Sequence, residues 1–142
     1  MTGGPSDDDI RRVLQGARVI AMVGASPDPA RPSFGVGQFL VARGYRVIPV
    51  NPKAAGDMLF GETVVADLSA AREADMVDVF RRSDAVPAVM EEAVRVLPKL
   101  CAIWLQLGVR HPQAAGLARA GGVDLIEDRC PAIEFRRLGL RR

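Results

Sequence analysis

Small residues that suit an anion site follow an apolar segment, in the stretch Gly24-Ala25-Ser26, and glycine recurs at Gly35 and Gly37. Glycine exposes backbone N–H groups and permits close approach, and such groups beside the start of a helix bind phosphate. We expect a diphosphate site in which the Ser26 hydroxyl donates a hydrogen bond and Arg31 adds charge. The spacing departs from G-x-G-x-x-G, because leucine replaces its third glycine. The alternative is a strand-to-helix turn that simply requires glycine.

A lysine, rare in this chain, follows a second apolar segment in the sequence Asn51-Pro52-Lys53; only two of the nineteen basic residues are lysines. Proteins that bind NAD usually carry an acidic residue here, which accepts hydrogen bonds from the ribose hydroxyls. An ammonium group instead suits a phosphorylated ribose, either the 2′-phosphate of NADP or the 3′-phosphate of coenzyme A. The alternative is that Lys53 is an exposed turn residue.

Two adjacent arginines end a further apolar segment, in Phe80-Arg81-Arg82. Neighbouring side chains of extended backbone point in opposite directions, so we expect one guanidinium to face phosphate and the other to face solvent. Phe80 covers an adenine or a pantetheine arm in this interpretation, and packs at a strand end in the alternative one.

Groups that could perform covalent chemistry are few. The sequence offers one histidine, His111, and shows no Ser/His/Asp set, paired carboxylates or metal-ligand cluster, so we assign no reaction and no metal. Cys130 is the reactive candidate: we expect it on the rim of the ligand site, where Arg129 favours the thiolate. If the ligand is coenzyme A, the oxidised protein could carry a mixed disulfide between Cys130 and the coenzyme A thiol. We expect Cys101 to be inert, and Asp78 to be buried with a satisfied hydrogen bond.

The elements that position these residues alternate between strand and helix. Apolar strands separated by helices are typical of a parallel sheet covered on both faces, so the chain is predicted to be a three-layer α/β protein with a Rossmann-like strand order of 3-2-1-4-5-6. The ligand crevice should then open between the ends of the first and fourth strands, at Gly24 and Phe80. The strands are expected at residues 19–23, 45–50, 62–65, 76–80, 100–105 and 123–126, and the main helices after Ser6 and at residues 33–43, 84–97 and 112–120.

Length and composition narrow the class of protein. The 142 residues predict one domain over 1–142, with a flexible N-terminus at 1–6 and an irregular C-terminal tail at 131–142. A net charge of +2, with dispersed basic residues, argues against nucleic-acid binding. Without a long apolar run or a charged leader, we expect a soluble cytoplasmic protein with no membrane partner. The apolar residues of the tail leave two arrangements open, packing on the sheet or contact with a second copy in a homodimer.

Several motifs occur in order: VGASPDPARPSFGVG, RVIPVNPK, VDVFRR, IWLQLGV and DRCP. Together they resemble the stand-alone CoA-binding domain proteins (the YccU-like family), which are similar in fold to the N-terminal domain of the succinyl-CoA synthetase α subunit. The resemblance covers residues 7–138. It implies a Rossmann-like fold that binds coenzyme A, with the diphosphate at VGAS, the phosphorylated ribose near the lysine, and the pantetheine along the loops after the fourth and fifth strands. The implied site residues are Gly24, Ala25, Ser26, Arg31, Lys53, Phe80, Arg81, Arg82, Gln106, Leu107 and Gly108, to which we add Gly35 and Asn51.

The sequence departs from the synthetase in one respect. That enzyme carries a phosphorylated histidine in a second domain, which has no counterpart in these 142 residues, so ligase chemistry is not expected. Two functions remain: a non-catalytic carrier or sensor of coenzyme A or acyl-CoA, and an NADP-dependent oxidoreductase or other dinucleotide-binding domain. The shortness of the chain favours the first.

Overall fold

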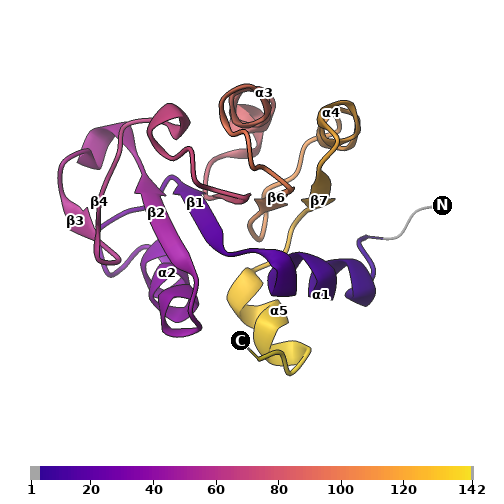
Figure 1. Ribbon diagram of the computed structural model, residues 1–142, viewed down its shortest axis with the longest axis horizontal. Helices are drawn as coiled ribbons and strands as arrows, with labels where there is room; N and C mark the ends of the chain where they lie inside the picture. Colours follow the sequence, from indigo (N-terminus) through magenta and orange to yellow (C-terminus); the bar gives the residue numbers. More distant parts are fainter. Residues whose placement is uncertain (1–3, 142) are drawn as a thin grey trace.

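The computed structural model describes residues 4–141, which form three layers with a parallel sheet in the middle (Figure 1). The sheet has the order β2-β1-β5-β6-β7, and all four pairings are parallel. Its strands are apolar on both faces, which requires helices on both sides. Their bounds are β1 (Val19–Val23), β2 (Arg46–Val50), β5 (Met76–Val79), β6 (Ala102–Leu105) and β7 (Asp124–Ile126).

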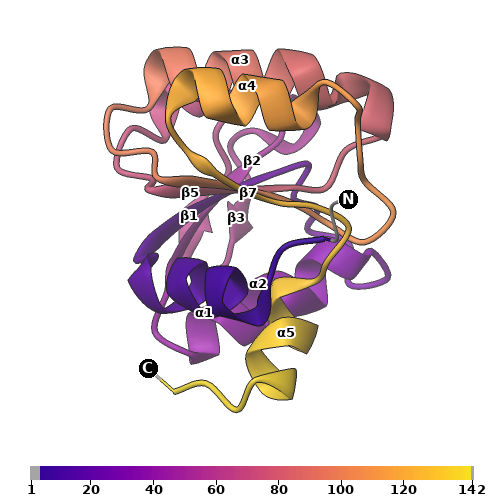
Figure 2. The same cartoon turned by 90° about the vertical axis from the view of Figure 1, so that its right-hand side faces the viewer.

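Helices cover both faces of the sheet. Figure 2 shows α3 (Val86–Val96) and α4 (Ala114–Gly121) on one face, and α1 (Asp7–Gly16), α2 (Pro32–Ala42) and α5 (Pro131–Arg137) on the other. The start of α1 follows from local chemistry, because Ser6 and Asp9 form the capping box that the sequence predicts. Short 3₁₀ turns at Pro52–Ala54, Leu68–Ala70 and Ser83–Ala85 connect the remaining elements.

The predicted α/β class and the order of five strands are confirmed, whereas the predicted strand at 62–65 is not a full member of the sheet. Val65 makes a single parallel bridge to Val50. The residues before it belong to a separate antiparallel hairpin of β3 (Met58–Leu59) and β4 (Glu62–Thr63). Phe60 and Gly61 join its strands with φ values of 57° and 76°, as a two-residue turn of the primed type requires. The hairpin therefore uses residues that the prediction assigned to the edge of the main sheet.

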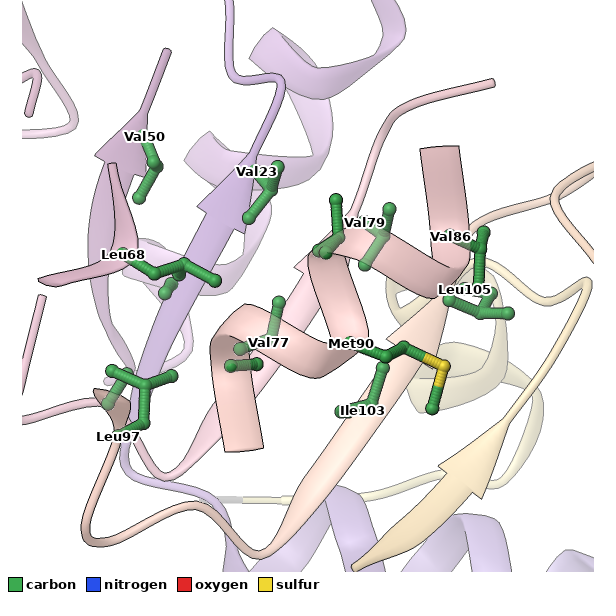
Figure 3. Packing of buried hydrophobic residues seen from close by; sticks show 14 of the residues in the cluster. Val23, Val50, Leu68, Val77, Val79, Val86, Met90, Leu97, Ile103 and Leu105 are labelled. Carbon is green, nitrogen blue, oxygen red and sulfur yellow. The ribbon is translucent and has the colours of Figure 1, made fainter. Parts of the chain in front are cut away.

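The buried apolar residues form two clusters, one on each face of the sheet. The cluster under α3 and α4 is shown in Figure 3, where Met90 of α3 lies over Ile103 and Leu105 of β6. The second cluster joins the opposite face to α1, α2 and α5, and includes Trp104, whose indole N–H donates to the carbonyl of Arg129 at 2.8 Å. Removal of this apolar surface from water on both faces stabilises the sheet and fixes the positions of its strand ends.

The C-terminal segment is helical, so its predicted irregular structure is wrong for residues 131–137. Phe135 of α5 is buried and packs edge-on against Phe39 of α2, with ring centroids 5.7 Å apart. The Arg137 guanidinium joins α5 to α1 through the Asp7 carboxylate at 2.7 Å. The segment thus packs against the body of the chain, while its alternative role in a dimer is untested. Half of the predicted flexible N-terminus, residues 1–3, lies outside the described residues, and Ser6 at its other end caps α1.

No helix within residues 4–141 has both the length and the apolar composition that a membrane span requires.

Candidate functional site

A cleft of about 860 Å³ opens at the carboxyl ends of β1, β2, β5 and β6. It lies at the point where strand order reverses, since β1 lies between β2 and β5, the usual ligand position in such sheets. Ten of the sequence-predicted site residues line it: Gly24, Ser26, Arg31, Asn51, Lys53, Phe80, Arg81, Arg82, Gln106 and Leu107. The structure therefore brings together residues that are up to 83 positions apart in the chain, as the difference 107 − 24 shows.

Gly24 closes the bottom of the cleft, where β1 and β5 run side by side. Its φ is 85°, and its N–H donates to the carbonyl of Val50 at 2.9 Å. A Cβ atom placed on Gly24 would lie 2.2 Å from the carbonyl oxygen of Phe80. Glycine is thus required here by the backbone conformation and by the adjacent strand end, independently of any ligand.

The loop after Gly24 is held in shape by its own short polar side chains. The backbone N–H of Ser26 donates to Ser33 Oγ, and that of Asp28 donates to Ser26 Oγ, each at 3.1 Å. Asp28 Oδ1 accepts from the N–H of Ala30 at 2.9 Å. These bonds use the hydroxyl oxygens as acceptors, which leaves the hydroxyl proton of Ser26 available to a ligand in the cleft.

The start of α2 faces this cleft through Arg31, Pro32 and Ser33. Arg31 occupies the N-cap position and provides no side-chain acceptor for the first turn, and Pro32 has no N–H to be satisfied. Helix N-termini carry partial positive charge. The first turn of α2 therefore presents an uncapped, electropositive end to the cleft, which is suited to an anion.

Charge in the cleft is strongly unbalanced. Four cationic side chains line it, and Asp57 is the single carboxylate among its lining residues in the described chain. Within residues 4–141, Arg82 is the only one of the four that forms an ion pair, a 3.4 Å contact with Asp84 that is almost fully exposed. Such exposed pairs contribute little. The other three cations, Arg31, Lys53 and Arg81, are thus available to an anionic ligand.

Asn51 links the two loops on the β1 and β2 side of the cleft. Its amide N–H donates to the carbonyl of Ala25 at 2.8 Å, and its oxygen accepts from the N–H of Lys53 at 3.0 Å. Both polar groups of Asn51 are thereby used within the protein. Its main effect is to hold Lys53 next to the glycine loop, so it acts as a positioning residue.

A smaller cleft of about 490 Å³ lies beside the first one, toward α3. The two share Gly24, Asn51, Lys53, Phe80 and Arg81. Aliphatic side chains line its interior, and two carboxylates, Asp67 and Glu92, lie among them; the aliphatic residues are Val23, Val50, Leu68 and Val89. The shared cations, Lys53 and Arg81, thus stand between the two clefts.

Three predicted site residues do not line the large cleft. Ala25 is fully buried and contributes its carbonyl to Asn51. Gly35 lies within α2, where an added Cβ would meet no other part of the chain within 4 Å, and Gly108 donates its N–H to Asp128 Oδ1 at 2.7 Å. Gly37, which we expected to admit a ligand, instead admits a ring: a Cβ there would lie 2.0 Å from Phe60 Cζ.

Two buried polar side chains at the sheet have unsatisfied oxygens. Gln106 is only 7% exposed and lines the cleft, and its Oε1 has no hydrogen-bond partner among the described residues. Asp78, in the middle of β5, is fully buried, and both of its carboxyl oxygens lack a partner in the same part of the chain. The prediction of a satisfied Asp78 is therefore wrong. Burial raises the pKa of Asp78 well above its ordinary value.

The exposure of the two cysteines is the reverse of that predicted. Cys130 is 6% exposed, precedes α5 and is absent from the lining of the cleft, because the chain turns under the sheet after Arg129. Cys101 is exposed. The sequence places Cys130 directly after the last strand but carries no information on this turn.

Thiol labelling of the folded protein should therefore modify Cys101 first. We expect rapid reaction of one thiol with a colorimetric disulfide reagent and much slower reaction of the second, because burial limits access to Cys130. Mass spectrometry of the quenched protein identifies the site, and Cys101→Ser should remove the fast phase. A fast phase that survives in Cys101→Ser would contradict this assignment.

Six residues that line the cleft were not among the predicted site residues: Pro27, Pro32, Ser33, Ala54, Asp57 and Val109. Asp57 lies in the segment before β3, which carries no periodic pattern. Val109 follows the predicted Gln106-Leu107-Gly108 stretch, and its buried position results from the turn in which its N–H donates to the carbonyl of Gln106 at 2.8 Å. Extending the predicted stretch Gln106-Leu107-Gly108 by one residue would have included Val109 in the site.

The chain is similar to proteins of known sequence and structure. The uncharacterized protein YneT of Bacillus subtilis (strain 168) is 35% identical over 127 residues, which cover 89% of this chain and 91% of YneT. The structure of cell-free ID.343 from Thermus thermophilus is 38% identical, with a TM-score of 0.86 and coverage of 94% and 99%. A hypothetical protein from Pyrococcus horikoshii OT3 is 29% identical, with a TM-score of 0.86 and coverage of 96% and 94%.

A more distant similarity concerns the fold alone. The Rex-family repressor RSP, solved in complex with β-NADH, is 15% identical, with a TM-score of 0.57 over 89% of this chain and 63% of that one.

The family model described as "CoA binding domain" matches residues 18–136. This match includes every element from β1 to α5 except the last residue of that helix. Because the match covers most of the sequence, the chain belongs to the CoA binding domain family.

Proposed function

We propose that this protein binds coenzyme A or an acyl-CoA in the cleft at the carboxyl ends of the strands, as a carrier or sensor that makes and breaks no bond of its ligand. The observation that carries the proposal is the charge imbalance of the cleft, four cations against one carboxylate, beside the uncapped start of α2. Coenzyme A has a diphosphate and a separate ribose phosphate, and both anions need partners of this kind. Membership of the CoA binding domain family supports the same ligand.

The two clefts suggest an orientation for the ligand. The diphosphate lies at the first turn of α2 and near Arg31, and the ribose phosphate lies near Lys53, which lines both clefts. The adenine then enters the small cleft, where aliphatic side chains contact its faces and Asp67 or Glu92 accepts from its amino group. The pantetheine arm follows the large cleft toward Gln106, Leu107 and Val109, with the Gln106 Oε1 placed to accept from an amide N–H.

Ligand-dependent stability tests this function. Coenzyme A at 100 times its Kd should raise the free energy of unfolding by about 2.7 kcal/mol, which is readily detected as a rise in Tm. Acetyl-CoA should behave similarly and should be recovered intact after incubation with the protein. Stabilisation by NADP with none by coenzyme A would overturn the proposal in favour of a dinucleotide site.

Lys53→Ala should weaken coenzyme A far more than 3′-dephospho-coenzyme A. A hydrogen bond to a charged group contributes about 1.5–3 kcal/mol, so we expect roughly a 10- to 150-fold loss for coenzyme A and little change for the dephospho form. Isothermal titration calorimetry measures both. Lys99→Ala is the matched control, because it removes the other lysine, which pairs with Glu73 at 2.8 Å and lines neither cleft. Equal losses for the two ligands would remove Lys53 from this role.

A further inference from the structure

A further concave site lies at the opposite end of the strands, where β1 begins. It has a volume of about 560 Å³ and is lined by Gln15, Arg18, Ala42, Arg43, Gly44 and Arg141. These residues come from the end of α1, the start of β1, the end of α2 and the C-terminal segment. None of them lines the two clefts at the carboxyl ends of the strands.

Among the described residues, the charged side chains that line this concavity are all cationic. Three guanidinium groups and no carboxylate line it, and none of the three arginines forms an ion pair with a residue of the described chain. The carboxylate of Asp75 lies beside the site, because it accepts hydrogen bonds from the backbone N–H of Arg18 at 3.1 Å, but it does not line the concavity. Among residues 4–141, no lining carboxylate therefore offsets the mutual repulsion of the three guanidiniums.

The end of α2 offers few acceptors to these arginines. Guanidinium groups often satisfy the last carbonyls of a helix, but backbone donors already bond to those of Phe39, Leu40 and Val41. The N–H of Arg43 bonds to the carbonyls of Phe39 and Leu40, and the N–H of Gly44 bonds to that of Val41. In α1, the carbonyl of Leu14 accepts from the Tyr45 hydroxyl. No hydrogen bond within residues 4–141 has a side-chain donor of Arg18, Arg43 or Arg141, so these donors remain available to another acceptor.

One of the guanidiniums is held in place by an aromatic ring. The Cζ atom of Arg43 stands 4.3 Å from the centroid of the Phe39 ring, a cation–π contact. Phe39 itself packs on Phe135 of α5. Part of the entropy that Arg43 would lose on binding a ligand is thereby already lost in the free protein, which favours binding.

We propose that this arginine concavity, formed by Arg18, Arg43 and Arg141, is a second anion site that binds a small oligophosphate or the phosphate groups of a phosphorylated metabolite. Guanidinium groups match the geometry of phosphate oxygens with paired hydrogen bonds. The absence of aromatic and large aliphatic side chains from the lining residues favours recognition of charge over recognition of a base or an acyl chain. The proposal does not depend on the ligand of the main cleft.

Sodium triphosphate is the probe, titrated by calorimetry at constant ionic strength. Wild-type protein should bind it, and Arg18→Gln should weaken this binding by about tenfold or more, as expected for loss of a hydrogen bond to a charged group. Arg18→Lys should give an intermediate loss, because lysine keeps the positive charge but lacks the planar set of N–H donors that pairs with phosphate oxygens. Arg46→Gln is the matched control: it removes an exposed arginine that pairs with Glu62 and does not line the concavity.

Triphosphate could also bind the cations of the main cleft. Arg31→Gln distinguishes the two sites, because Arg31 lines the main cleft and not the arginine concavity. The arginine concavity should retain its binding step in Arg31→Gln and lose it in Arg18→Gln. Unchanged binding by Arg18→Gln, or loss of all triphosphate binding in Arg31→Gln, would overturn the proposal, as would a wild-type protein that binds no triphosphate. Because no arm uses coenzyme A, failure of this site and failure of the proposed function are distinguishable.

Discussion

Gly24→Ala should destabilise the protein by about 2–5 kcal/mol and remove coenzyme A binding. Part of the loss arises because an alanine at the φ of 85° adopted by Gly24 costs roughly 1–2 kcal/mol. The rest arises because the new methyl group would lie 2.2 Å from the carbonyl oxygen of Phe80. That oxygen belongs to the backbone at the end of β5 and cannot rotate away, so the strand ends must separate, at a cost typical of overpacking of roughly 1–3 kcal/mol.

Chemical denaturation and calorimetry measure this effect, with an expected fall in Tm of roughly 6–15 °C. Gly35→Ala is the matched control. Gly35 lies within α2 with nothing within 4 Å of an added Cβ, so alanine should stabilise the helix by about 0.5–1 kcal/mol and leave coenzyme A affinity unchanged. A Gly24→Ala protein as stable as wild type would refute the requirement for glycine. Weaker binding of coenzyme A by Gly35→Ala would indicate that Gly35 belongs to the binding site after all.

The sequence was sufficient to predict the sheet because its strands are buried on both faces. A continuous apolar run of four or five residues between two helices is typical of a buried parallel strand. The order of β2, β1, β5, β6 and β7 then follows from right-handed crossovers. The hairpin of β3 and β4 was not predictable in this way. It depends on a left-handed Phe60, whose ring packs against Gly37 of α2, a contact between segments that are remote in sequence.

Helix α5 was missed for a related reason. Only two large apolar residues, Ile133 and Phe135, lie within it, and Ile133 is exposed. The side chains that it buries besides Phe135 include the small Ala132 and the charged Glu134, which pairs with Arg137 at 2.7 Å. Pro131 at the first helical position and two arginines in the last turn were the signals present.

The position of the candidate site was predictable and the roles of several residues in it were not. Parallel strands bring their carboxyl ends to one edge, so Gly24, Lys53 and Arg81 had to meet there. A glycine can make room for a ligand or for a side chain of the protein. Its neighbours in the folded chain decide between the two, and the sequence does not show them. Gly37 accommodates the Phe60 ring, and Asn51 uses both polar groups on the loops that hold Lys53.

The stability of Asp78→Asn relative to wild type should increase with pH. Burial raises the pKa of the Asp78 carboxyl well above its ordinary value, so the folded protein keeps a proton that the unfolded chain releases. Between the unfolded and folded pKa values, the folded state therefore binds one more proton than the unfolded state. The free energy of unfolding then falls by about 1.4 kcal/mol for each unit of rising pH, and asparagine, which does not titrate, removes this contribution.

The decisive quantity is the difference in unfolding free energy between Asp78→Asn and wild type, measured by urea denaturation between about pH 5 and pH 7. The buried amide adds its own unsatisfied donors, but that cost is independent of pH and does not alter the slope. Carboxylates whose pKa is lowered by partners, such as Asp9 beside Ser6 and Arg12, lose their contribution to stability as pH falls in both proteins, so these contributions cancel in the difference.

Asp8→Asn, which removes an exposed carboxylate of α1, controls for overall charge. A difference that is the same at every pH would mean that Asp78 is ionised in the fold, and that an internal water or a ligand supplies the hydrogen bonds its oxygens lack.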